Sequence, residues 1–275
     1  MTFTSDVLTL SVDGAIATLW LDRVEARNAM GRDLWRDLPL AAQAVADNSE
    51  IRVLIIAAKG PHFTVGLDLK QMGGTLVGSG ESRSHAQKSA AMFQAVLDMQ
   101  QAITVFEQLQ VPVIAAVHGY CIGGGIDFIT AADIRFASSD AIFSVREAKV
   151  AIVADLGTLQ RLPRIVSPGH VAELAFTGKD IDAHRAERIG LVNEVVTGSA
   201  DEVYRKALEV AEEIAANSPL VVAGTKKVLA FNDGHTVDEG LKFVAAWNTM
   251  YLQSNDLIEA MTAFMEKRGA HFTGS

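Results

Sequence analysis

The sequence predicts an α/β fold, and two features of its 275 residues support that class. Through residues 1–196, short apolar runs rich in β-branched residues alternate with helix-like stretches, which favours parallel strands joined by right-handed helical crossovers. Beyond Val196, the amphipathic stretches all have helical periodicity. We therefore expect one domain, with an α/β core over residues 1–196 and a helical region over residues 197–275.

Local patterns predict the elements in chain order. VLTLSVDGAIATLWL alternates apolar and polar residues around Asp13-Gly14, which predicts a β-hairpin that turns at this dipeptide. Residues 32–46 have helical periodicity, and a second helix is expected over about residues 83–108. IRVLIIAA (51–58) and VPVIAAVHG (111–119) are typical of strands buried on both faces. A helix that starts in glycines and two short strands, IRFAS and AIFSV, follow.

Composition argues against several classes of function. Asp and Glu (33) outnumber Lys and Arg (24), and the formal net charge of -9 disfavours a nucleic-acid partner. No run of 18 or more uncharged apolar residues suggests a membrane span. The single cysteine, Cys121, allows no internal disulfide, and the seven histidines show no zinc-ligand spacing. We therefore expect no metal site. The first residues and the final GAHFTGS resemble no targeting signal, so we expect a cytoplasmic protein.

Two loops that follow apolar strands are candidates for binding an oxyanion. AAVHGYCIGGGIDF starts a helix at or near Gly124, and the first amides of a helix have no intrahelical partner. In HFTVGLDLKQM, Gly66 frees the backbone before Leu67. If the amides of Leu67 and Gly124 face one point, they form an oxyanion hole that stabilises an enolate. A tight turn with close helix packing is an equally simple interpretation of the glycine triplet.

Three acidic residues lie among apolar neighbours near these loops. Asp127 stands just inside the glycine-started helix, Glu147 in SVREAKV and Asp155 in IVADLGTLQRL. Taken singly, each is more simply explained as a helix cap or a surface charge, and Asp155 in particular precedes a possible helix. Asp133, which precedes a strand, is expected to have a structural role.

The sequence resembles the enoyl-CoA hydratase/isomerase (crotonase) family through FTVGLDL, PVIAAVHGYCIGGGIDF, DIRFASSDAIFSVREAKV and GTLQRLPRIV, in that order. The resemblance spans nearly the whole chain. Hydratases of the family carry two catalytic glutamates twenty residues apart, and Asp127 and Glu147 occupy those places. Aspartate at the first place, Asp155 in DLGTLQRLP and the C-terminal WNTMYLQSNDL resemble the dienoyl-CoA isomerase branch of the family.

This resemblance implies the crotonase fold, which consists of stacked ββα units with C-terminal helices that mediate trimers, usually paired as hexamers. It also implies a CoA thioester substrate and no separate cofactor, because coenzyme A is part of the substrate. The amides of Leu67 and Gly124 would hold the thioester oxygen. Basic groups near the CoA phosphates would be Arg27 and Lys267. The other residues expected to contact the substrate or CoA are Val65, Gly66, Asp68, Leu69 and Gly125.

The isomerase branch moves a proton from C2 of a 3,5-dienoyl-CoA to C6 through a dienolate. The resemblance implies that Glu147 is the base at C2, that Asp155 is the acid at C6, and that Asp127 polarises or orients its partners. Three carboxyl groups in one apolar pocket cannot all ionise cheaply, so at least one pKa should be raised.

Two other functions stay open. In a 2-enoyl-CoA hydratase, Asp127 and Glu147 would hold a water molecule, and Asp155 would only cap a helix. A non-catalytic CoA-ester-binding or RNA-binding protein of the same fold is the second alternative. The net charge of -9 and the complete set of acids count against that second alternative.

Overall fold

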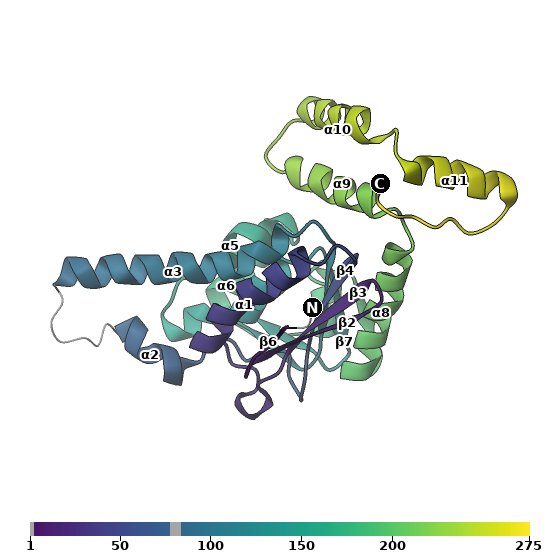
Figure 1. Cartoon of the computed structure of the whole chain (residues 1–275). Helices are drawn as coiled ribbons and strands as arrows, with labels where there is room; N and C mark the ends of the chain where they lie inside the picture. The colour runs from purple at the N-terminus through teal and green to yellow at the C-terminus, as the bar shows by residue number, and fades with distance from the viewer. Residues whose placement is uncertain (1–2, 78–83) are drawn as a thin grey trace.

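The computed structural model describes residues 3–77 and 84–275, and its main body is built on a seven-stranded sheet with the order β1-β2-β3-β4-β5-β7-β10 (Figure 1). Strands β1 to β3 pair antiparallel, and the pairs from β3 to β10 are parallel. A smaller sheet has the order β6-β8-β9. The strands are β1 (Phe3–Thr4), β2 (Leu8–Asp13), β3 (Ile16–Leu21), β4 (Val53–Ala58), β5 (Val113–Val117), β6 (Tyr120–Ile122), β7 (Ile134–Ser138), β8 (Ile142–Ser144), β9 (Ile181–Asp182) and β10 (Glu194–Val196).

Helices cover both faces of the large sheet. One face packs against a core that includes α1 and α3, and the other face packs against α8. The 3-10 helices are η1 (Val24–Ala26), η2 (Glu147–Val150) and η3 (Leu162–Arg164). The α-helices are α1 (Arg32–Ala46), α2 (Leu69–Val77), α3 (His85–Glu107), α4 (Gly124–Thr130), α5 (Thr158–Arg161), α6 (Pro168–Thr177), α7 (Ala183–Arg188), α8 (Ala200–Ala215), α9 (Pro219–Phe231), α10 (Val237–Tyr251) and α11 (Asn255–Glu266).

The long elements lie where the sequence predicts them. The helix expected over residues 32–46 is α1, and α3 lies within the expected 83–108. Every residue of β4 and β5 is buried, as expected for central parallel strands. The hairpin is also confirmed, but its turn is one residue later than predicted. Asp13 still pairs with Ile16, so the connecting residues are Gly14 and Ala15, with Gly14 at φ 54°.

The helical region after residue 196 is divided between the body and an appendage. Its first helix, α8, belongs to the body, because Val203, Ala207 and Ala211 pack on the sheet beside β4 and β5. The helices α9, α10 and α11 extend away from the body (Figure 1). The elements after residue 196 are all helices, and the appendage, α9 to α11, begins at Pro219.

Asp133 has the structural role that its position predicts. Its carboxylate accepts a hydrogen bond from the backbone amide of Val113 at 2.7 Å, at the start of β5. The same carboxylate pairs with Lys226 of α9 at 2.7 Å, and Lys226 also donates to the carbonyl oxygen of Val111 at 3.0 Å. Asp133 thus ties the first helix of the appendage to a central strand of the body.

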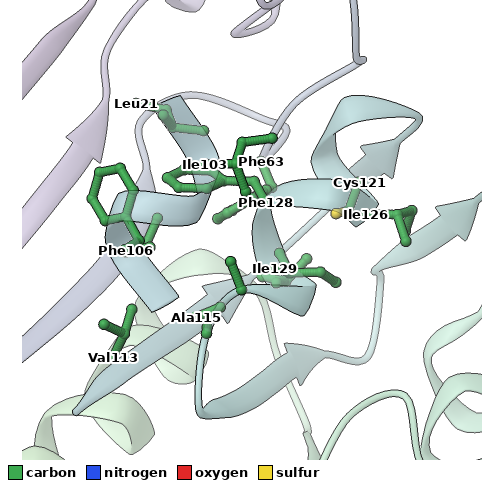
Figure 2. Packing of buried hydrophobic residues seen from close by; sticks show 14 of the residues in the cluster. Leu21, Phe63, Ile103, Phe106, Val113, Ala115, Cys121, Ile126, Phe128 and Ile129 are labelled. Atoms are coloured by element: carbon green, nitrogen blue, oxygen red, sulfur yellow. The ribbon is translucent and has the colours of Figure 1, made fainter. Parts of the chain in front are cut away.

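The helix α4 is fixed by the core of the body. Figure 2 shows its Phe128 and Ile129 among the buried side chains that also include Ile103 and Phe106 of α3. Phe128 is fully buried, and its ring meets that of Phe106 edge to face with the centroids 5.1 Å apart. The position of Asp127 is therefore set by the packing of its neighbour in sequence.

Replacing Phe128 by alanine is expected to lower the free energy of unfolding by about 3–5 kcal/mol, because it removes a buried ring and leaves a cavity. Urea denaturation followed by circular dichroism measures this loss. Phe176→Ala is the matched control, since that ring is 82% exposed, and it should change the unfolding free energy little. Equal effects of the two variants would contradict the packing described here.

Among residues 3–77 and 84–275, no helix has the length and apolar character that a membrane span requires. Within the same ranges, no group of three or more His, Cys, Asp or Glu side chains is arranged to hold a metal ion.

Candidate active site

The two loops singled out in the sequence lie side by side. The segment from Thr64 runs next to β6, because Thr64 N donates to Tyr120 O at 2.8 Å and Ile122 N donates to Thr64 O at 3.2 Å. Gly66 follows with φ 83°, and a Cβ atom at this position would lie only 2.7 Å from Ile122 O. The close approach requires glycine. It brings the backbone just before Leu67 against the backbone just before Gly124.

The amides of Leu67 and Gly124 are free for a ligand. Neither donates a hydrogen bond to another residue of the described part of the chain, whereas the neighbouring amides are engaged. Gly66 N donates to Thr64 Oγ1 at 3.1 Å, and Gly123 N donates to Ser144 O at 2.9 Å. Gly124 is also the first residue of α4, where helix geometry leaves the amide unpaired. Two adjacent free donors can bind one oxygen that carries negative charge.

Asp127 is buried beneath these loops. Its side chain is only 1% exposed, and Oδ1 accepts a hydrogen bond from the backbone amide of Thr158 at 2.6 Å. Burial raises the pKa of Asp127 to about 6; the bond from Thr158 acts in the opposite direction, and the charge of Asp155 adds to the rise. The carboxylate therefore caps the short helix α5 while remaining close to the other acids.

Glu147 lies beside the loop that carries Gly124. Its Oε1 is 3.2 Å from the point that a Cβ atom of Gly123 would occupy, and its Oε2 is buried without a hydrogen-bond partner among the described residues. Burial raises the pKa of Glu147 to about 7, and the negative charges of Asp127 and Asp155 contribute. A carboxyl group that titrates near neutral pH without a fixed partner is suited to take up a proton.

Asp155 lies in the segment just before α5. In the sequence it could equally be a helix cap, but the N-cap residue of α5 is Gly157, and the first amide of that helix, from Thr158, is bound by Asp127. Its charge contributes to the raised pKa of both Asp127 and Glu147. Asp155 is the most exposed of the three acids in the single chain, yet partial burial still raises its pKa. The helix-cap explanation is wrong.

The residues expected to contact CoA lie in different surroundings. The carboxylate of Asp68 is engaged within the fold: Oδ1 accepts from the amides of Lys70 and Gln71 at 3.1 Å, and Oδ2 pairs with Arg23 at 2.8 Å. Burial would raise the pKa of Asp68, but the hydrogen bonds and the ion pair with Arg23 outweigh it and lower the pKa. Because Oδ1 binds the amides of Lys70 and Gln71, the side chain caps the start of α2.

The two basic residues differ in their distance from the loops. Arg27 is exposed and adjoins the first loop, since its carbonyl oxygen accepts from Val65 N at 3.3 Å. Lys267 ends α11, which lies far from β6 and α2 in Figure 1, so a single chain does not bring it to the site. Leu69, 52% exposed, opens α2 beside the first loop, and Gly125 packs against the side chain of Thr64.

The sequence alone did not reveal several residues that organise the site. Thr64 links the two loops, Thr158 binds Asp127, and Gln100 of α3 donates to the carbonyl oxygen of Asp155 at 2.6 Å. None of them carries a charge, and each acts across a long separation in sequence. Arg161 is also buried beneath the turn that carries Asp155. The stretch GTLQRLP contains Thr158 and Arg161, but only the fold shows what they contact.

Comparisons with known proteins show which proteins this chain resembles. The sequence model of a family described as enoyl-CoA hydratase/isomerase matches residues 11–275. Among curated proteins, the peroxisomal Delta(3,5)-Delta(2,4)-dienoyl-CoA isomerase of Arabidopsis thaliana is 40% identical over 98% of this chain and 96% of its own length. The mitochondrial protein of the same name from Dictyostelium discoideum is 44% identical over 92% of this chain and 86% of its own length. The crystal structure of an enoyl-CoA hydratase from Bacillus anthracis superimposes with a TM-score of 0.88 at 28% identity, covering 98% of this chain and all of that one.

Proposed function

The chain belongs to the enoyl-CoA hydratase/isomerase family and has the crotonase fold, and from this membership we propose that it converts 3,5-dienoyl-CoA thioesters to 2,4-dienoyl-CoA thioesters. The observation that carries the proposal is the third acid. Asp155 caps no helix and precedes Thr158 by three residues, and the amide of Thr158 binds Asp127 Oδ1 at 2.6 Å. Its charge also contributes to the raised pKa of Asp127 and of Glu147. The names of the similar proteins from Arabidopsis thaliana and Dictyostelium discoideum support the same reaction.

The proposed reaction uses the two free amides and two of the acids. The thioester oxygen accepts hydrogen bonds from Leu67 N and Gly124 N, and the carboxylate of Glu147 removes a proton from C2. The C2–H electron pair forms the C2=C3 double bond, and the conjugated electrons extend to C6 as a dienolate. The carboxyl group of Asp155 then donates its proton to C6, which leaves double bonds at C2 and C4. Glu147 ends protonated and Asp155 ionised, and exchange with solvent restores both.

Asp127 is proposed to orient and tune the other acids. Its hydrogen bond from Thr158 fixes the residue that follows the turn of Asp155, and its charge raises the pKa of Glu147. It has no proton-transfer step of its own in this scheme. Asp127 is only 1% exposed, as expected for a residue that supports the other acids without contacting the substrate.

A 2-enoyl-CoA hydratase remains the alternative within the family, since Asp127 and Glu147 occupy the places of the two hydratase glutamates. Assays with 3,5-dienoyl-CoA and with crotonyl-CoA separate the two functions. The proposed isomerase produces a 2,4-diene conjugated with the thioester, which absorbs at longer wavelength, whereas hydration removes the absorbance of crotonyl-CoA. Rapid hydration of crotonyl-CoA without any conversion of 3,5-dienoyl-CoA would contradict the proposal.

The dependence on pH follows from the same assignments. We expect kcat/KM to rise as the pH increases through about 7, because burial raises the pKa of Glu147 to about 7 and the base must be ionised. Asp155 must be protonated to act as the acid, so the rate should also fall once the pH exceeds the pKa of Asp155, which partial burial raises. A pH–rate profile with 3,5-dienoyl-CoA measures both limbs. A rate that stays constant across the whole range would contradict these roles.

The family membership also suggests how the protein assembles and what it uses. We propose a trimer or a dimer of trimers, because α10 and α11 expose large apolar side chains, among them Leu241 (62%), Ile258 (65%) and Phe264 (85%). Sedimentation equilibrium measures this state.

No cofactor beyond the CoA of the substrate is proposed, and fatty-acid β-oxidation is the proposed setting. We keep the cytoplasm as the proposed location, although the two similar isomerases are named as peroxisomal and mitochondrial.

A further inference from the structure

We propose that Arg161 and Gln100 are positioning residues that hold the turn of Asp155 (residues 155–157) against α3. The inference rests on the proposed function, because it explains how the acid at C6 is held in place. The carboxyl group of Asp155 has no hydrogen-bond partner among the other described side chains, so its position depends on its backbone. That backbone is bound on two successive carbonyl oxygens. Gln100 Nε2 donates to Asp155 O at 2.6 Å, and Arg161 Nη1 donates to Leu156 O at 3.3 Å.

Arg161 is in turn anchored to α3. Its Nε pairs with Glu107 Oε2 at 2.8 Å, and its Nη2 donates to Thr104 Oγ1 at 2.8 Å. The side chain is only 10% exposed, so removal of these partners would leave a buried charge. Gln100, Thr104 and Glu107 are spaced four and three residues apart, which puts them on one face of the helix. A single rigid helix therefore supports the whole turn of Asp155.

The guanidinium and the turn are in direct contact. Gly157 has φ 128°, and a Cβ atom at this position would overlap with Arg161 Nη1. The next residue, Thr158, donates its amide to Asp127 Oδ1 at 2.6 Å. Displacement of the turn would therefore change the distance between Asp155 and Asp127. Glu147 belongs to a different segment, η2, and none of the contacts made by Gln100 or Arg161 reaches it.

This separation predicts which step fails when the support is removed. Proton removal from C2 depends on Glu147 and the two amides, whereas proton delivery to C6 depends on the position of Asp155. A displaced turn should therefore slow formation of the 2,4-diene and leave exchange of the C2 proton with solvent intact. A general loss of folding would lower both rates together, so the ratio of the two rates distinguishes positioning from a purely structural role.

The test compares Gln100→Leu and Arg161→Met with the controls Gln101→Leu and Arg164→Met. Gln101 is the exposed neighbour on α3, and Arg164 contacts Glu107 at 3.7 Å without contacting the turn. Diene formation from 3,5-dienoyl-CoA is followed by absorbance, and deuterium uptake at C2 is measured in D₂O by mass spectrometry. For the first two variants we expect kcat to fall about 10- to 100-fold, with KM and C2 exchange within about twofold of wild type. The controls should match wild type in all three quantities.

Arg161→Lys separates charge from position. Lysine keeps a positive charge for Glu107 but lacks the fork that reaches Thr104 and Leu156 together, so the same loss of diene formation with normal C2 exchange is expected. If Arg161→Met does not fold, Gln100→Leu carries the test, because it removes one neutral donor. Unchanged diene formation in Gln100→Leu, or an equal fall in both rates, would overturn the inference. A wild-type protein that converts no 3,5-dienoyl-CoA at all would overturn the proposed function, and this inference with it.

Discussion

Replacing Asp155 by asparagine is expected to lower kcat for 3,5-dienoyl-CoA by about 10²- to 10⁴-fold, the usual contribution of one proton-transfer group. The amide has nearly the same shape as the acid but cannot deliver a proton to C6. KM should change by less than about threefold, because the proposed contacts with the thioester oxygen come from the amides of Leu67 and Gly124 and not from this side chain. Uptake of deuterium at C2 should persist. Absorbance of the 2,4-diene and mass spectrometry in D₂O measure the two steps.

The matched control for this variant is Asp98→Asn, an exposed aspartate of α3 that contacts Gln94 and lies outside the site. It should retain wild-type rates. Since the side chain of Asp155 is itself exposed and caps no helix, Asp155→Asn should also unfold at the same denaturant concentration as wild type. A variant with near-normal isomerase activity would show that Asp155 is not the acid.

Replacing Glu147 by glutamine is expected to reduce diene formation by a similar factor of about 10²- to 10⁴-fold and, unlike Asp155→Asn, to abolish deuterium uptake at C2. Oε2 has no partner among the described residues, and burial raises the pKa of the group to about 7, so the wild-type carboxyl is poised to accept a proton at neutral pH. Glutamine removes that capacity without changing the volume of the side chain.

The pair of variants assigns the two roles independently. Loss of C2 exchange in Glu147→Gln, together with its retention in Asp155→Asn, identifies the base and the acid. The opposite pattern would show that the roles are exchanged. Glu50→Gln, at an exposed position between α1 and β4, is the control and should leave both rates unchanged.

The sequence predicted the long elements because their patterns are local. Fifteen residues of helical periodicity define α1, and runs of β-branched residues define β4 and β5. The strands β6 and β9 are three and two residues long, too short for any periodicity to appear. The start of α2 could have been found, because Asp68 stands directly before an apolar helical run, as an N-cap residue does.

The acids of the site were accessible from the sequence through motif spacing, but their partners were not. An aspartate before Leu-Gly-Thr looks like a helix cap, yet the amide of Thr158 is bound by Asp127, 31 residues away in the chain. Likewise, Gln100 and Asp155 are separated by 55 residues, and only the packing of α3 brings them together. Contacts of this kind depend on tertiary packing, which no local pattern encodes.

The pairing of Thr64 with Tyr120 and Ile122 has a consequence for how catalysis begins. These backbone hydrogen bonds join the two loops that carry the free amides into one continuous piece of sheet-like structure. In the proposed mechanism, the donors are therefore held in place by the backbone before they bind the thioester oxygen. If the proposal holds, discrimination between substrates depends on the surfaces that meet the acyl chain, because every CoA thioester would present the same carbonyl group to these amides.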